Sequence, residues 1–148
     1  MARGVDVVTE TAIRRPRDRV AAYAGDPGNA PEWYANIDSV EWRTDPPVAV
    51  GSRMDFVAAF LGRRLAYTYE VVALVPGERL VMRTAQGPFP METTYTWQSL
   101  DAATTRMTLR NRGRPRGFSV LAAPFMAAAV RRANRADLRR LREVLERS

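Results

Sequence analysis

The sequence predicts an α+β fold with an antiparallel sheet of seven strands, two short helices after the first strand, and one long C-terminal helix. Three observations lead to this fold class. Residues 5–13 follow a period of two, six further strand-like segments lie between residues 40 and 112, and an amphipathic stretch closes the chain. The turns between the six segments have hairpin lengths, which favours antiparallel pairing. A chain of 148 residues, 46% of them hydrophobic, predicts one domain over residues 1–148.

The first strand is expected over Val5–Ile13, where one face carries valine, threonine and isoleucine and the other carries acidic side chains. Pro16 suits the first turn of a helix that ends at Gly25. Asp26 precedes a proline and can cap a second short helix, which contains Trp33. Two short helices are therefore expected between the first and second strands.

Six segments predict strands two to seven, and turn residues separate them: SVEWRT, RMDFVAAFL, RLAYTYEVVALV, RLVMRTA, METTYTWQSL and TRMTLRN. Their bulky side chains recur at a period of two: Met54, Phe56, Phe60, Tyr67, Tyr69, Met82, Tyr95 and Trp97. Such a face can fill a core, which is the default interpretation, or line a hollow. The tyrosines favour a pocket, because buried hydroxyl groups need partners and ligand sites combine apolar walls with a few polar groups.

The long helix is expected from Phe118 to Arg147, with Pro124 in its first turns. Its apolar stripe consists of Met126, Ala127, Val130, Ala133, Leu138, Leu141, Val144 and Leu145. Asn134 and Asp137 lie inside this stripe. A buried amide and a buried carboxylate are costly unless they are hydrogen-bonded or face water or a ligand. These two side chains therefore either bond to a neighbouring strand or loop, or point into a cavity and orient a ligand.

Arginine supplies all 23 basic side chains and gives a formal charge of +7, which we interpret mainly as compositional bias. On the long helix, Arg139 and Arg142 stand four residues before Glu143 and Glu146, so part of the charge is locally paired. Five more arginines recur at even spacing in and after the seventh strand: Arg106, Arg110, Arg112, Arg114 and Arg116. We expect a solvated edge strand there, with a phosphate or membrane-surface site as the alternative.

Several residue types are absent, which narrows the chemistry. The chain contains no Cys, no His and no Lys. It therefore cannot form a Ser-His-Asp triad, a thiolate nucleophile, a Cys/His zinc site or a lysine Schiff base. Asp, Glu and Tyr remain for acid–base work, with Arg as an electrostatic clamp. We predict no metal and no cofactor.

The sequence also bears on location. No apolar run approaches the roughly 20 residues of a membrane span. The first ten residues lack the apolar core of a signal peptide. By default we expect a cytoplasmic protein.

Five stretches share their order and spacing with a known superfamily: AIRRPRDRVAAYAGDPGNAPEW, VGSRMDF, YEVVALVPGERLVMRT, TTRMTLRNRG and ADLRRLREVLE. With them the chain resembles the START-like helix-grip superfamily (SRPBCC), and within it the polyketide cyclase/dehydrase branch. The resemblance implies a curved sheet that grips the C-terminal helix, with a hydrophobic cavity that the short helices close. It places Trp33 and Tyr34 near the cavity mouth, and on the helix side Met126, Val130, Asn134 and Asp137. It implies ligands such as lipids, sterols or polyketides, and in some members cyclisation or dehydration.

Three hypotheses for function follow. The first is binding of a small apolar or amphipathic molecule, with these candidate ligand-binding residues: Trp33, Tyr34, Met54, Phe56, Phe60, Tyr67, Tyr69, Met82, Tyr95, Trp97, Met126, Val130, Asn134 and Asp137. The second is a cyclase or dehydratase in which Asp137 is the acid–base group and Tyr67, Tyr69 or Tyr95 donates to a developing enolate.

The third hypothesis is a basic module that docks on a polyanion through the arginines of the seventh strand. The sequence argues against nucleic acid, because no aromatic residue interleaves with these arginines before Phe118. A weak contact with an anionic lipid surface stays open. The sequence does not indicate an oligomeric state.

Overall fold

The computed structural model describes residues 4–60, 62–114 and 123–148. Its elements are β1 (Val5–Ile13), α1 (Arg17–Ala24), the 3-10 helix η1 (Pro27–Asn29), α2 (Ala30–Trp33), β2 (Ile37–Trp42), β3 (Arg53–Phe60), β4 (Arg63–Val75), β5 (Arg79–Gln86), β6 (Met91–Asp101), β7 (Thr104–Gly113) and α3 (Ala123–Arg147). The predicted α+β fold is confirmed. The second strand begins and ends two residues earlier than the segment SVEWRT.

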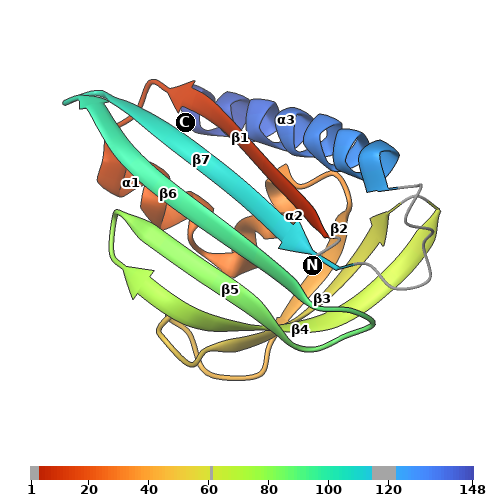
Figure 1. The fold of residues 1–148 in the computed structure, drawn as a ribbon. Coiled ribbons are helices and arrows are strands. Elements are labelled where there is room, and N and C mark those ends of the chain that lie inside the picture. The colour runs from red at the N-terminus through yellow and green to blue at the C-terminus, as the bar shows by residue number, and fades with distance from the viewer. Residues whose placement is uncertain (1–3, 61, 115–122) are drawn as a thin grey trace.

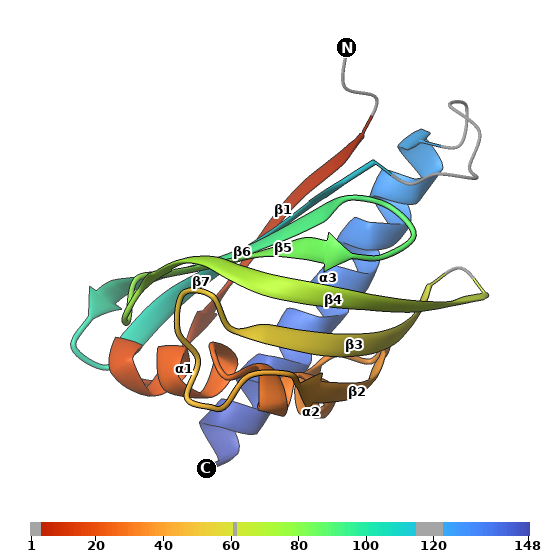
Figure 2. The same ribbon diagram turned by 90° about the horizontal axis from the view of Figure 1, so that it is seen from below.

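All seven strands form one antiparallel sheet in the order β1-β7-β6-β5-β4-β3-β2. The sheet curls into a half-barrel, and α3 lies along its hollow side (Figures 1 and 2). In the view of Figure 1, α1 and α2 lie below α3. The pairing of β4 with β5 is irregular at two places, between Thr68 and Tyr69, where β5 has the extra residue, and between Val71 and Ala73, where β4 has it. Bulges of this kind bend a strand and increase its twist, so they help the sheet to curl.

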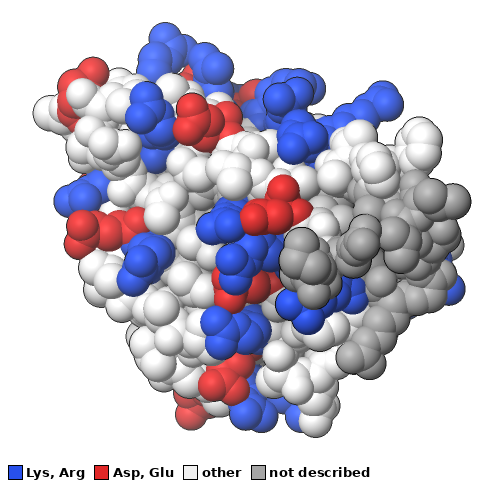
Figure 3. Space-filling view, in the orientation of Figure 1, with Lys and Arg blue, Asp and Glu red and all other residues white. Residues whose placement is uncertain are grey.

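The expectation that the seventh strand lies at an edge of the sheet is wrong. β7 lies between β1 and β6, because the first strand pairs with the last over a long sequence separation. On its outer face Arg110 pairs with Asp6 at 2.6 Å, and Arg112 pairs with Glu92 at 3.1 Å. Blue and red side chains accordingly alternate along this face (Figure 3). These arginines already have carboxylate partners, which weakens the polyanion hypothesis.

Helix α3 presents the predicted faces. The predicted helix start at Phe118 lies outside the described residues, as does Arg116. Of the two predicted i,i+4 pairs, Arg142–Glu146 forms at 3.3 Å, while Arg139–Glu143 is not among the ion pairs of the described residues. Glu146 also accepts a hydrogen bond from the backbone N–H of Arg14, with 2.8 Å between the heavy atoms, which fixes the C-terminal end of α3 to the end of β1.

Within the described ranges, no helix is long and apolar enough to cross a membrane.

Across the ranges that the structure describes, the buried apolar residues form two separate clusters. The larger cluster joins the sheet to α1, α2 and the C-terminal half of α3, and it includes Trp33, Leu138 and Leu141. The smaller cluster joins β1 to the N-terminal half of α3 through Val7 and Met126. The core is therefore divided along the length of α3.

Candidate functional site

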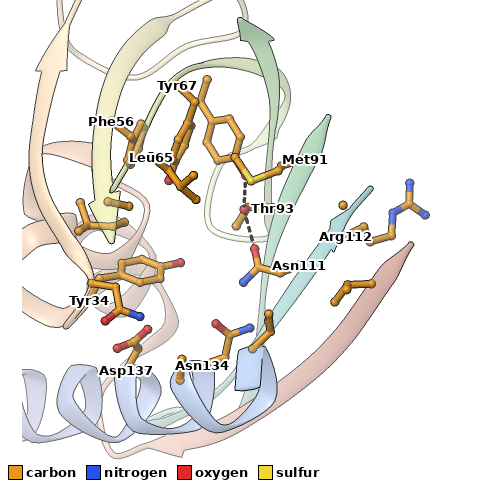
Figure 4. A pocket seen from close by; sticks show the side chains of 18 of the residues that line it. Tyr34, Phe56, Leu65, Tyr67, Met91, Thr93, Asn111, Arg112, Asn134 and Asp137 are labelled. Atoms are coloured by element: carbon orange, nitrogen blue, oxygen red, sulfur yellow. Dashed lines mark hydrogen bonds between the residues drawn. The ribbon is translucent and has the colours of Figure 1, made fainter. Parts of the chain in front are cut away.

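A pocket of about 180 Å³ lies between the concave face of the sheet and the N-terminal half of α3 (Figure 4). Its walls are mostly apolar and aromatic, and residues of both core clusters contribute to them. An apolar cavity of about 150 Å³ is large enough to bind benzene. The pocket therefore has room for a ligand with a single ring, and larger ligands must extend through its opening.

The structure brings ten of the predicted site residues to this pocket: Tyr34, Phe56, Tyr67, Tyr69, Met82, Tyr95, Met126, Val130, Asn134 and Asp137. Three others, Met54, Trp97 and Trp33, do not line it and are buried in the larger core cluster instead. The side chain of Phe60 lies outside the described part of the chain. The ligand-binding role of the ten residues stays a prediction.

Trp33 and Tyr34 differ, although the resemblance placed both near the cavity mouth. Trp33 ends α2 and is completely buried. Tyr34 follows with extended backbone, so its ring leaves the helix in another direction and reaches the pocket. The two ring centroids still lie 4.1 Å apart. Trp33 thus supports the ring of Tyr34 from the core side.

Asp137 projects from α3 into the pocket (Figure 4). Its side chain is buried, and its Oδ1 accepts a hydrogen bond from the backbone N–H of Ala35, which lies 3.0 Å away in the connection between α2 and β2. Burial raises the pKa of Asp137 to about 6, although the Ala35 N–H and the charge of Arg140 oppose the shift. Asp137 therefore bonds to a loop and also faces the pocket, and its role in orienting a ligand stays a prediction.

Asn134 lies one helical turn before Asp137 and is only 4% exposed. Its side chain lines the pocket, and its Nδ2 has no hydrogen-bond partner among the described residues. A buried donor without a partner costs about 1–3 kcal/mol. Asn134 therefore faces the pocket with an unused donor.

The tyrosines of the pocket are hydrogen-bond donors at neutral pH. The hydroxyl groups of Tyr34 and Tyr95 lie 2.7 Å apart, and those of Tyr69 and Thr93 lie 2.8 Å apart. Burial raises the pKa of Tyr69 to about 12, and it also raises the pKa values of Tyr34, Tyr67 and Tyr95 above their usual range. These phenols stay protonated, so none of them is a base.

Several pocket residues were not predicted from the sequence. Leu65, Met91, Thr93 and Asn111 lie on the strands at positions that continue the inward alternation of the predicted residues. Asn111, for example, follows Leu109 by two residues on β7 and therefore points to the same face. The alternation of inward and outward positions could have identified Asn111. However, Asn111 is polar, and the pattern was defined by bulky apolar and aromatic side chains.

Comparisons with known proteins agree with this architecture. A Thermus thermophilus protein, TTHA0849, is similar at 21% identity, with 97% of this chain and 99% of that chain covered and a TM-score of 0.82. The Zhui aromatase/cyclase from Streptomyces sp. R1128 is similar at 18% identity, with coverage of 97% and 94% and a TM-score of 0.80. A START superfamily protein from Mycobacterium smegmatis is similar at 12% identity, with coverage of 96% and 97% and a TM-score of 0.82. At these identities the likeness shows the fold.

The family is shown by a separate comparison of the sequence. No curated protein matches the chain significantly. However, the sequence profile of one family, described as polyketide cyclase / dehydrase and lipid transport, matches residues 4–146. With its curled sheet and its long C-terminal helix the chain has the predicted helix-grip fold, and by this match over nearly its whole length it belongs to the polyketide cyclase/dehydrase and lipid transport family.

Proposed function

We propose that this protein binds a small, largely apolar molecule in the pocket between the sheet and α3, and that polar side chains at the helix orient it. The family description, which includes lipid transport, and the apolar walls of the pocket support the proposal. Burial of apolar surface supplies the driving force, at about 25 cal/mol per Å².

The observation that carries the proposal is the Nδ2 of Asn134, which has no partner among the described residues and lies in a mostly apolar pocket. Of the three buried side-chain donors without a partner among the described residues, only Asn134 lines the pocket, and such a group needs an explanation. An acceptor atom of a bound ligand would explain this donor, because it would supply the missing hydrogen-bond partner. Asp137 adds a carboxylate beside it, of which one oxygen accepts from Ala35.

The test uses 1-naphthol as the probe, followed by its fluorescence, together with native mass spectrometry of freshly purified protein. Ala133 lines the pocket, so Ala133→Phe should fill it and weaken binding of the probe at least tenfold. Ala136→Phe is the matched control, because it adds the same side chain at an exposed position of α3. Equal affinities of the two variants would show that the probe does not occupy the pocket.

A second candidate function, a cyclase or dehydratase, is favoured by the combination of Asp137 and the phenols. A carboxylate with a pKa near neutrality can abstract a proton from a carbon next to a carbonyl group. The protonated hydroxyl groups of Tyr67 or Tyr95 can donate to the enolate oxygen that develops, whereas the hydroxyl proton of Tyr69 is engaged with Thr93. Asp137 raises the pKa values of both Tyr34 and Tyr95 by its charge, which indicates that it lies close to these phenols.

For this candidate, the test is turnover of a short poly-β-ketone. Asp137→Asn should abolish turnover while the affinity for the ketone changes less than threefold, because asparagine keeps the oxygen that accepts from Ala35. Unchanged turnover in Asp137→Asn would reject the enzymatic role and leave the binding function intact.

A further inference from the structure

Two asparagine side chains approach the pocket from opposite walls. Asn111 lies near the end of β7, and Asn134 lies on α3. Both line the pocket, and their carboxamide groups point toward each other across it (Figure 4). The hydrogen bonds of the described residues do not join them to each other.

The hydrogen bonds behind Asn111 fix the orientation of its amide group. Thr93 donates from its Oγ1 to Oδ1 of Asn111 at 2.7 Å. Because a threonine hydroxyl has one proton, the hydroxyl of Tyr69, which lies 2.8 Å from the same Oγ1, must donate to Thr93. The oxygen of Asn111 is thus occupied, and its Nδ2 donors are left over.

Asn134 presents a second set of unused donors. Its side chain is more than nine-tenths buried, and its Nδ2 has no partner among the described residues. Two amide donors therefore face a shared space, and neither forms a hydrogen bond with an acceptor in the described part of the chain. An acceptor atom of a ligand would satisfy both.

The charges around this space disfavour an anionic acceptor. Asp137 lies one helical turn after Asn134 and carries the nearest carboxylate on α3, whereas Arg63, which also lines the pocket, lies at the start of β4 and not on β7 or α3, the elements that carry the two asparagines. The guanidinium group of Arg112, by contrast, points away from the pocket (Figure 4) and pairs with Glu92 on the outer face at 3.1 Å. A carboxylate between the two asparagines would therefore meet a like charge without a cation from Arg112 to compensate it.

We propose that Asn111 and Asn134 determine ligand specificity by jointly binding one uncharged acceptor oxygen, such as the carbonyl oxygen of a ketone, ester or amide. The inference rests on the proposed binding function and adds the chemical group that the pocket selects. It also assigns a ligand-binding role to Asn111, which the sequence patterns did not single out.

The test compares two probes of nearly the same shape. Acetophenone has a carbonyl oxygen where α-methylstyrene has a CH₂ group. Asn134→Leu and Asn111→Leu keep the approximate side-chain volume but remove the amide donor. Each variant should bind acetophenone about tenfold more weakly than the unmodified protein, because one lost hydrogen bond of about 1.4 kcal/mol corresponds to a factor of about ten. Each variant should bind α-methylstyrene as well as the unmodified protein does, or better. Arg135→Leu, at an exposed position next to Asn134, is the control and should change neither affinity.

A spectroscopic measurement separates a direct contact from a structural effect. The carbonyl ¹³C resonance of labelled acetophenone should move downfield on binding to the unmodified protein, and by less in each leucine variant. Benzoate should bind more weakly than acetophenone, and tighter binding of benzoate would overturn the preference for an uncharged oxygen.

The outcomes distinguish this inference from the proposed function. If both probes bind and the leucine variants weaken the binding of both probes equally, the joint binding of one oxygen by Asn111 and Asn134 is rejected while the binding function stands. If neither probe binds the unmodified protein, both proposals fail.

Discussion

Replacing Asn134 with leucine should make the ligand-free protein more stable, although it should damage ligand binding. Asn134 is 4% exposed, and its Nδ2 lacks a partner among the described residues, so the folded chain carries the cost of desolvating that donor. Removing an unsatisfied buried donor should recover about 1–3 kcal/mol. Leucine also has the higher helix propensity, which adds up to about 0.5 kcal/mol.

The expected gain is therefore about 2 kcal/mol in the free energy of unfolding, which corresponds to a rise in Tm of about 4–8 °C for a chain of this size. Urea unfolding followed by the fluorescence of the buried Trp33 and Trp97 measures it directly. The protein should first be unfolded and refolded so that no co-purified ligand stabilises it.

Arg135→Leu controls for the added apolar surface, since its position on α3 is exposed. It should change the free energy of unfolding by less than about 0.5 kcal/mol. If Asn134→Leu gains no more than this amount, helix propensity alone explains the result. In that case Asn134 is satisfied in solution and the reasoning about its role in the pocket is refuted.

Three further predictions concern Asp137, Gly87 and Leu141. Burial raises the pKa of Asp137 to about 6 in the folded protein, above its unfolded value of about 3.9. Between these pH values the folded chain binds more protons than the unfolded chain. Its free energy of unfolding therefore falls as the pH rises from about 4 to about 6. Urea titrations near pH 4 and near pH 7 should show that Asp137→Asn removes about 2–3 kcal/mol of this fall; an unchanged pH dependence would contradict the raised pKa. A Cβ atom on Gly87 would lie 2.9 Å from Cβ of Tyr67, so Gly87→Ala should displace Tyr67 and weaken 1-naphthol binding, and unaltered affinity would show that the loop adjusts instead. Leu141 is completely buried against the sheet, so Leu141→Ala should cost about 2–5 kcal/mol in urea unfolding, whereas Val144→Ala at a half-buried position should cost less.

The local patterns of the sequence predict much of the fold, because strand alternation and helical periodicity depend on neighbouring residues. The period of two placed Tyr67, Tyr69 and Tyr95 on one face of the sheet, and the structure brings all three to the pocket. The helical stripe likewise identified Asn134 and Asp137 as polar residues on the buried side of α3. These predictions needed only the geometry of single elements.

Features that depend on distant contacts were not predictable in this way. β7 was expected at an edge because nothing in its own sequence indicates that β1 pairs with it. Trp33 and Tyr34 are adjacent aromatic residues, and the end of α2 between them decides that one enters the core and the other the pocket. The alternation of β7 places Asn111 on the inward face, but its role as a donor toward the pocket depends on the hydrogen bond from Thr93 and on the opposite side chain of Asn134, which are distant in the sequence.

The division of the core into two clusters would give a bound ligand a structural role. The smaller cluster around Val7 and Met126 is separate from the larger one, and the pocket is lined by residues of both. A bound apolar molecule would join the two clusters into one continuous interior, with its oxygen connecting β7 to α3 through the two asparagines. The bound ligand would then hold the N-terminal half of α3 to the sheet. Loading should therefore slow amide hydrogen exchange in residues 126–134 more than in residues 138–145, where the protein supplies its own packing.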